Sequence, residues 1–116
     1  MKVAVYLRTA TSGQDEEQQL AAQRDLVTQP YAQHGMVIHD FHTDRGVSGL
    51  TAFEQRPEGS RLLDDAQTRA FDVVIVQRID RLARDASIIG TVQHQLAASG
   101  IQLESLDCRP TPVVSY

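Results

Sequence analysis

Five arginines are the residues of this sequence best suited to chemistry on a charged substrate. Arg8 follows a short apolar run, Arg56 stands before a proline, and Arg78, Arg81 and Arg84 recur at intervals of three residues. Guanidinium groups bind phosphate oxygens in pairs and stabilise the negative charge that develops during phosphoryl transfer. A helical turn would place the last three on one face. The pattern predicts a site for a phosphate or phosphodiester. The alternative is a set of solvated arginines paired with neighbouring acids.

Hydroxyl side chains follow the same apolar run that Arg8 ends. Thr9, Thr11 and Ser12 lie in a small polar segment, where a hydroxyl could attack a phosphate held by the arginines. The other interpretation is that these hydroxyls satisfy backbone groups of a loop. No histidine neighbours them in sequence, so the residues alone leave the choice open.

The acidic residues do not form a metal-binding pattern. Asp40, Asp44 and Asp80 lack the spacing of a magnesium site, and the sequence holds no glycine-rich phosphate loop. We therefore predict no metal site and no cofactor.

Composition is that of an ordinary globular chain, with 41% hydrophobic residues and a net charge of −4. The acidic balance argues mildly against nucleic-acid binding, which favours a basic surface. The arginines at 78–84 are clustered, and local charge outweighs the sum. No apolar run approaches the ~20 residues of a membrane span, and the first residues do not resemble a signal peptide. We expect a cytoplasmic protein that does not contact membranes. The single Cys108 has no partner for an internal disulfide.

Strand-like and helix-like segments alternate along the chain. Apolar runs predict strands at 3–7, 36–41, 71–76 and 101–106, and helical spacing predicts helices at 15–33, 57–70 and 85–99. The expected core positions on the helices are Leu20, Val27, Tyr31, Leu62, Leu63, Ala66, Ile88, Ile89, Val92 and Leu96.

This alternation predicts an α/β fold: a mostly parallel central sheet of four to five strands with helices on both faces. Ligands of such sheets gather at the carboxyl ends of the strands. Arg8, Asp44, Ser48 and the segment 77–84 fall at those ends.

Five segments, in order, resemble motifs of one family. They are 6–14 (YLRTATSGQ), 20–24 (LAAQR), 44–49 (DRGVSG), 55–63 (QRPEGSRLL) and 71–85 (FDVVIVQRIDRLARD). Each alone is weak, but together they resemble the N-terminal catalytic domain of serine site-specific recombinases, the resolvase/invertase family. The resemblance implies a resolvase-like catalytic domain at 1–107 and a tail at 108–116.

The resemblance also implies a mechanism. Members of that family cut DNA with a serine hydroxyl and form a 5′-phosphoserine link, without a metal or a high-energy cofactor. The implied partners are DNA and further copies of the chain, as dimers and tetramers. By position, the implied catalytic residues are Arg8, Arg56, Arg81 and Arg84, with Asp80 to orient them, and the supporting residues are Tyr6, Gln14, Gln23 and Ser48.

Ala10 stands at the position of the family's nucleophilic serine. Alanine has no attacking atom, so we expect no covalent intermediate from this chain. Thr9, Thr11 or Ser12 would have to replace it from a shifted position, and a misplacement of about 1 Å is already costly. Ala10 is either an engineered replacement or natural drift, and Thr9, where the family usually has an aliphatic residue, favours drift.

Length is the second departure from the family. Its members continue into a long dimerisation helix and a DNA-binding domain, whereas this sequence stops at Tyr116. We expect weak DNA binding and a monomer or weak dimer from the chain alone.

Two other classes compete with the enzyme. One is a degenerate recombinase domain that only binds partners or DNA. The other is a phosphate-responsive receiver, which is disfavoured because Arg8 ends the first strand where a receiver carries acids.

Overall fold

The computed structural model describes residues 2–9, 18, 20–25 and 37–105. Within them lie four strands: β1 (Lys2–Arg8), β2 (Val37–Asp44), β3 (Val73–Val76) and β4 (Gln102–Ser105). They form one parallel sheet in the order β2-β1-β3-β4. The predicted α/β fold with a parallel sheet is confirmed. No helix in these ranges is long and apolar enough to cross a membrane.

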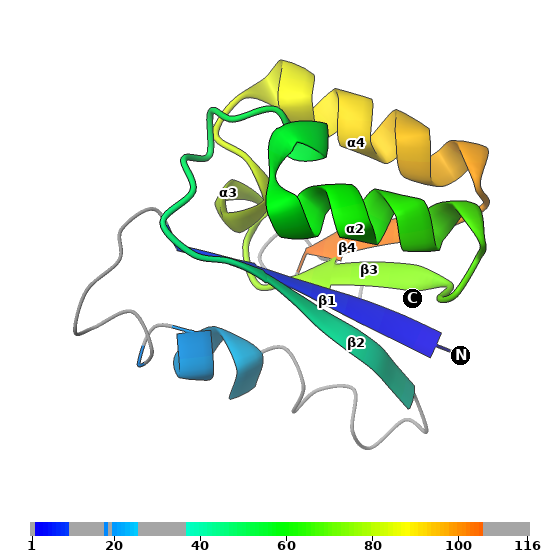
Figure 1. Ribbon diagram of the computed structural model, residues 1–116, viewed down its shortest axis with the longest axis horizontal. Coiled ribbons are helices and arrows are strands. Elements are labelled where there is room, and N and C mark those ends of the chain that lie inside the picture. Colours follow the sequence, from blue (N-terminus) through cyan, green and yellow to red (C-terminus); the bar gives the residue numbers. More distant parts are fainter. Residues whose placement is uncertain (1, 10–17, 19, 26–36, 106–116) are drawn as a thin grey trace, which may run out of the picture.

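Helices lie on both faces of this sheet (Figure 1). On one face lie α2 (Pro57–Gln67) and α4 (Ala86–Ala98), with the short η1 (Phe53–Gln55) and α3 (Ile79–Leu82) at one end. The helical residues 20–25 lie on the other. Parallel strands need such crossover connections because the chain must return to the end of the sheet where the previous strand began before it starts the next one.

Two apolar clusters make the core, one on each face. The α2–α4 side buries Leu62, Ala66, Val92 and Leu96, with Leu63, Ile88 and Ile89 packed against them at partial exposure. The other side buries Leu20 against strand residues of β1 and β3. The helix core positions predicted within the described residues are therefore confirmed; Val27 and Tyr31 lie outside them.

Strand β2 is longer than its apolar residues predicted. The predicted strand ended at Phe41, with a loop from Thr43, but pairing with β1 continues to the Arg8–Asp44 pair. The final residues of β2 are polar on the side that faces α2, so an apolar pattern could not reveal them. The register skips His39, because Val3 pairs with Ile38 and Ala4 with Asp40.

This one-residue bulge reverses which side chains face which layer. Ile38 and Phe41 join the cluster around Leu20, although they are three apart. Asp40, His42 and Asp44 then share the opposite face, beside α2. The bulge therefore lines the β2–α2 boundary with ionisable groups.

Candidate active site

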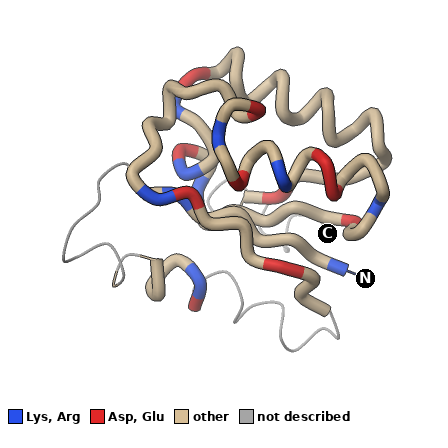
Figure 2. The backbone as a smooth tube through the Cα atoms, in the orientation of Figure 1, with Lys and Arg blue, Asp and Glu red and all other residues tan. Residues whose placement is uncertain are grey.

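The carboxyl edge of the sheet gathers most of the arginines that the sequence singled out. Figure 2 shows that basic segments concentrate around the ends of β1 and β2 and at α3. Arg8 ends β1, Arg56 precedes α2, and Arg81 lies in α3. Arg8 and the start of α3 lie together because the parallel strands β1 and β3 end at the same edge.

Arg8 is a buried arginine that holds a loop and a short helix to the end of β1. Its side chain is 1% exposed. Nε donates to the carbonyl of Arg81 at 3.0 Å, Nη1 to that of Val47 at 2.9 Å, and Nη2 to that of Asp80 at 2.6 Å. A buried guanidinium requires such acceptors, because leaving its N–H groups unpaired is costly. Arg8 thereby fixes both the 47–51 loop and α3.

Arg56 is buried completely and uses all of its N–H donors within the protein. Nε and Nη2 donate to the carbonyl of Thr51 at 3.1 and 2.9 Å, and Nη2 also to that of Gly49 at 3.3 Å. Nη1 donates to the hydroxyl of Tyr6 at 3.1 Å and to the carbonyl of Leu82. In this arrangement Arg56 has no donor left for a phosphate.

Asp44 is a buried acid that links this arginine to a helix. Its Oδ2 accepts the Tyr6 hydroxyl at 2.8 Å and the backbone N–H of Gly59 at 3.1 Å, and Oδ1 accepts the N–H of Glu58 at 2.9 Å. The last two donors are unpaired groups of the first turn of α2, where a carboxylate also suits the helix dipole. Burial is the largest effect on the Tyr6 hydroxyl and raises its pKa, so it stays a proton donor to Asp44.

The central position of Asp44 was not predicted from sequence beyond its place at a strand end. One feature of the sequence could have indicated this role. Pro57 at the first helical position has no N–H, so the free N–H groups of Glu58 and Gly59 need an acceptor from another segment.

The 78–84 arginines do not share one helical face. Only Arg81 lies inside α3, while Arg78 and Arg84 flank it. Arg78 is exposed and pairs with the carboxylate of Asp80 at 3.2 Å. The prediction of a stacked trio is wrong, because the helix spans one turn and Ala83 is already extended.

Asp80, expected to orient the catalytic arginines, contacts Arg8 through its carbonyl and Arg78 through its carboxylate. Among the described residues its other carboxylate oxygen, Oδ1, is buried without a hydrogen-bond partner, and so is Nε of Arg81.

Arg84 is the exposed arginine of this group. Its backbone N–H donates to the carbonyl of Gly49 at 2.9 Å. A Cβ on Gly49 would lie 2.7 Å from Cγ of Arg84 and 3.0 Å from Nη2 of Arg8. The absence of a side chain at Gly49 therefore leaves room for the side chains of Arg8 and Arg84 to lie close to its backbone. Within the described ranges the guanidinium of Arg84 makes no hydrogen bond or ion pair.

The arginines interact electrostatically as one group. Burial lowers the pKa of Arg8, and the charges of Arg56, Arg81 and Arg84 lower it further, while Tyr6 acts in the opposite direction. Like charges are held together here by the fold, and an anion would relieve their repulsion. The edge is thus prepared for a negatively charged ligand.

Two supporting residues occupy different environments. Gln23 is 2% exposed, and its Nε2 donates to the carbonyl of Arg8 at 3.3 Å. Ser48 is exposed, and its Oγ accepts the N–H of Leu50 at 3.0 Å, which is a local turn contact.

The nucleophile position itself lies outside the described residues, as do Gln14, Thr11 and Ser12. Thr9 is described and completely buried, and its Oγ1 accepts the N–H of Gly46 at 3.3 Å. A buried hydroxyl in this position is poorly placed to attack a substrate from solvent.

These observations define an α/β domain with arginines gathered at the carboxyl edge of a parallel sheet. The family model described as Resolvase, N terminal domain matches residues 3–113, so the chain belongs to the resolvase family of serine recombinase catalytic domains. The chain is also 33% identical over 105 residues to the transposon Tn2501 resolvase of Escherichia coli, covering 90% of this chain and 50% of that protein. It thus spans about half the length of that curated relative.

Solved structures agree with this assignment. The N-terminal catalytic domain of TP901-1 integrase matches with a TM-score of 0.82 and 34% identity, over 92% of this chain and 79% of that one. A resolvase family site-specific recombinase from Streptococcus pneumoniae matches with a TM-score of 0.77 and 22% identity, over 99% and 81%. At that lower identity the likeness concerns the fold alone.

Proposed function

We propose that this domain binds a DNA phosphodiester at its arginine edge, as part of a site-specific DNA recombinase. The observation that carries this is the convergence of Arg8, Arg56, Arg81 and Arg84 at the end of β1 and α3. Membership of the resolvase family, and the names of a transposon resolvase and an integrase among its relatives, support DNA as the ligand.

The arginines divide into two roles. The guanidinium groups of Arg8 and Arg56 donate mainly to backbone carbonyls. We assign these two arginines as positioning residues that fix the 47–51 loop, α3 and the start of α2. Arg84, which is exposed, and Arg81, which is half-buried, contact the phosphate. Their charges stabilise the transition state, in which negative charge builds up on the phosphoryl oxygens.

In family members that carry the nucleophilic serine, the serine oxygen attacks phosphorus and the bond between phosphorus and the 3′ oxygen breaks. The 5′ phosphate remains on the protein, and a 3′ hydroxyl leaves with a proton. Ala10 has no oxygen to attack with, so this chain binds the phosphodiester without forming the covalent link. Self-association to dimers or tetramers belongs to the same proposal.

Ala10 itself favours a second candidate, a natural non-catalytic module that binds DNA or partner subunits. It has the same arginine edge and the same ligand. The two differ in whether the remaining machinery still functions once a hydroxyl is restored.

The test of binding compares two matched substitutions. Arg84→Gln removes an exposed charge at the arginine edge, whereas Arg69→Gln removes an exposed charge at the amino end of β3. Affinity for a fluorescent duplex oligonucleotide is measured by anisotropy across a salt series.

We expect Arg84→Gln to weaken binding and reduce the slope of log affinity against log salt by about one, as for the loss of one phosphate contact. Arg69→Gln should leave the slope unchanged. Equal effects of the two substitutions would mean diffuse attraction with no phosphate site at this edge.

A further inference from the structure

His42 is a buried imidazole whose polar atoms lack partners. Its side chain is 0% exposed. Among the described residues neither ring nitrogen has a hydrogen-bond partner. The ring packs edge-on against Phe71, with centroids 6.4 Å apart. A buried polar group without a partner is rare in folded proteins and calls for a ligand or a structural reason.

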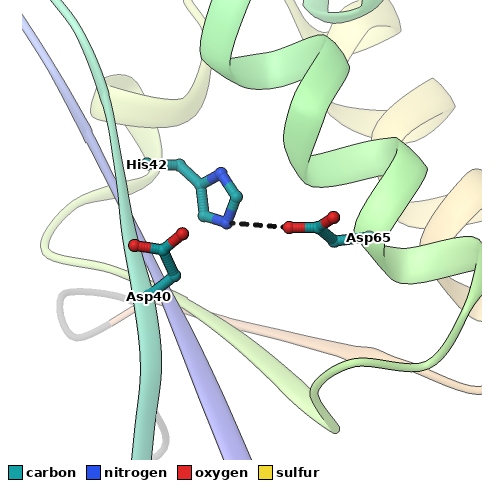
Figure 3. Close-up of side chains that lie close together, drawn as sticks. All are labelled: Asp40, His42 and Asp65. Atoms are coloured by element: carbon teal, nitrogen blue, oxygen red, sulfur yellow. Dashed lines mark ion pairs between the residues drawn. The ribbon is translucent and has the colours of Figure 1, made fainter.

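Carboxylates lie on both sides of this ring. Nε2 is 3.9 Å from Oδ2 of Asp65 on α2, and Nδ1 is 3.8 Å from Oε1 of Glu58 on the same helix. Asp40 lies on β2 two residues before His42, on the same face. Figure 3 shows the imidazole pointing toward Asp65, with the carboxylate of Asp40 beside it.

One ligand atom from each of Asp40, His42 and Asp65 can be chosen so that all lie within 4.8 Å of one another. Bonds of about 2.0–2.2 Å to a tetrahedral ion place ligand atoms roughly 3.4 Å apart. The two aspartates are 39% and 32% exposed, so small rotations of these side chains close that gap while the buried ring stays fixed. The same exposure gives an ion a path from solvent.

The charges around the ring favour a cation. Asp40, Glu58 and Asp65 are acidic, and Arg61, which bonds Asp40 at 2.8 Å and Glu58 at 2.6 Å, is the basic group among them. With a neutral imidazole the group is net negative. Burial, and next the charge of Arg61, lower the pKa of His42 against the opposing effect of the carboxylates. Metal binding requires the unprotonated ring, in which one nitrogen keeps a lone pair for the ion.

The remaining contacts resemble the outer partners of a metal site. Glu58 faces Nδ1, so it can accept that N–H and leave the lone pair on Nε2 for an ion. Asp40 accepts the N–H of Phe41 at 2.8 Å and the guanidinium of Arg61, which keep its carboxylate beside the ring. A carboxylate has further lone pairs for a metal beyond these two bonds.

We propose that Asp40, Nε2 of His42 and Asp65 bind a divalent transition-metal ion, of which Zn²⁺ is the best match. One imidazole and two carboxylates suit such an ion better than Mg²⁺ or Ca²⁺, which take oxygen ligands. The ion ties β2 to α2 and is structural, leaving the phosphodiester chemistry free of metal. This departs from the metal-free prediction, which considered Asp40 with Asp44 and Asp80.

The test measures Zn²⁺ binding to chelator-stripped protein by competition with a chromophoric chelator, together with the melting temperature with and without Zn²⁺. Asp65→Asn removes a proposed ligand. Asp64→Asn makes the same change of charge on the adjacent, exposed residue of the same helix. His42→Gln removes the imidazole, and His94→Gln, at an exposed position on α4, is its control. Circular dichroism verifies that each variant folds.

We expect about one equivalent of Zn²⁺ per chain, a higher melting temperature with Zn²⁺, and a loss of affinity of roughly tenfold or more in Asp65→Asn. Asp64→Asn and His94→Gln should bind as the unsubstituted chain does. Co²⁺ should give the intense visible bands of a low-coordinate ion that disappear in Asp65→Asn. Absent binding, or binding that survives both Asp65→Asn and His42→Gln, would overturn the proposal. Because Asp65 lies away from the arginine edge, DNA binding by Asp65→Asn separates this result from the proposed function.

Discussion

Arg8 and Arg56 use their hydrogen-bond donors to position the protein's own segments. Arg56 is fully buried, and its planar fork reaches Thr51, Gly49, Leu82 and Tyr6 at once. A lysine ammonium has the charge but not the fork, so it cannot satisfy carbonyls in these separate directions. The specific need is for arginine geometry rather than for positive charge alone.

Arg56→Lys should therefore lower the free energy of unfolding by about 2–4 kcal/mol, because several buried carbonyls lose their donors. Urea unfolding followed by circular dichroism measures the change. Arg61→Lys, at a 44% exposed ion pair, is the control and should change stability by less than about 1 kcal/mol. Equal stabilities for both variants would contradict the role given to Arg56.

At the scale of elements, the 47–51 loop closely approaches Arg84, which follows α3, at Gly49. This glycine is needed for space, since the described positive-φ glycines are Gly46 and Gly100. An added methyl group would press on Cγ of Arg84, which cannot swing away as a side-chain tip can.

Gly49→Ala should displace Arg84 and weaken oligonucleotide binding about as much as Arg84→Gln does, with a loss of stability of about 1–3 kcal/mol. Gly90→Ala is the matched control. Gly90 lies inside α4 with nothing within 4 Å of an added Cβ, so alanine there should stabilise by about 0.5–1 kcal/mol. Anisotropy and urea unfolding report both effects. Unchanged DNA binding in Gly49→Ala would show that Arg84 does not need this contact.

The elements show what sequence patterns can predict. The apolar run at 71–76 predicted a strand buried on both faces, which the structure has as β3 over Val73–Val76. The stripe with Val92 and Leu96 predicted the buried face of α4. Burial alone decides both features. The end of β2 was missed, since His42 and Asp44 are polar yet buried against α2. The bulge at His39 shifted the alternation further.

The site could be predicted only in outline. Position at strand ends placed Arg8 and Arg81 together, because parallel topology dictates where such ends meet. The burial of Arg8 and Arg56 was not foreseeable, since their acceptors include carbonyls of Val47, Thr51 and Leu82, which any residue could supply. The meeting of His42 with Asp65 joins a strand to a helix 23 positions on, and no local spacing encodes it.

At the scale of the whole molecule, a chain of net charge −4 carries a local basic edge. That edge is held in place by the buried residues Arg8, Arg56 and Asp44 and by the close packing at Gly49. We propose that the rest of the site is intact and that Ala10 alone removes the covalent step.

Ala10→Ser restores a hydroxyl at position 10 and shows whether the rest of the site still functions. The variant and the unsubstituted chain, each in the full-length form that the gene encodes, are incubated with supercoiled plasmids carrying DNA from the source locus. Covalent protein–DNA adducts are then precipitated with potassium dodecyl sulfate and sequenced. We expect adducts at a 5′ phosphate with Ala10→Ser, none from the unsubstituted chain, and few when Arg84→Gln is added. Adducts from the unsubstituted chain would contradict the account, as would their absence from a folded, DNA-binding Ala10→Ser variant.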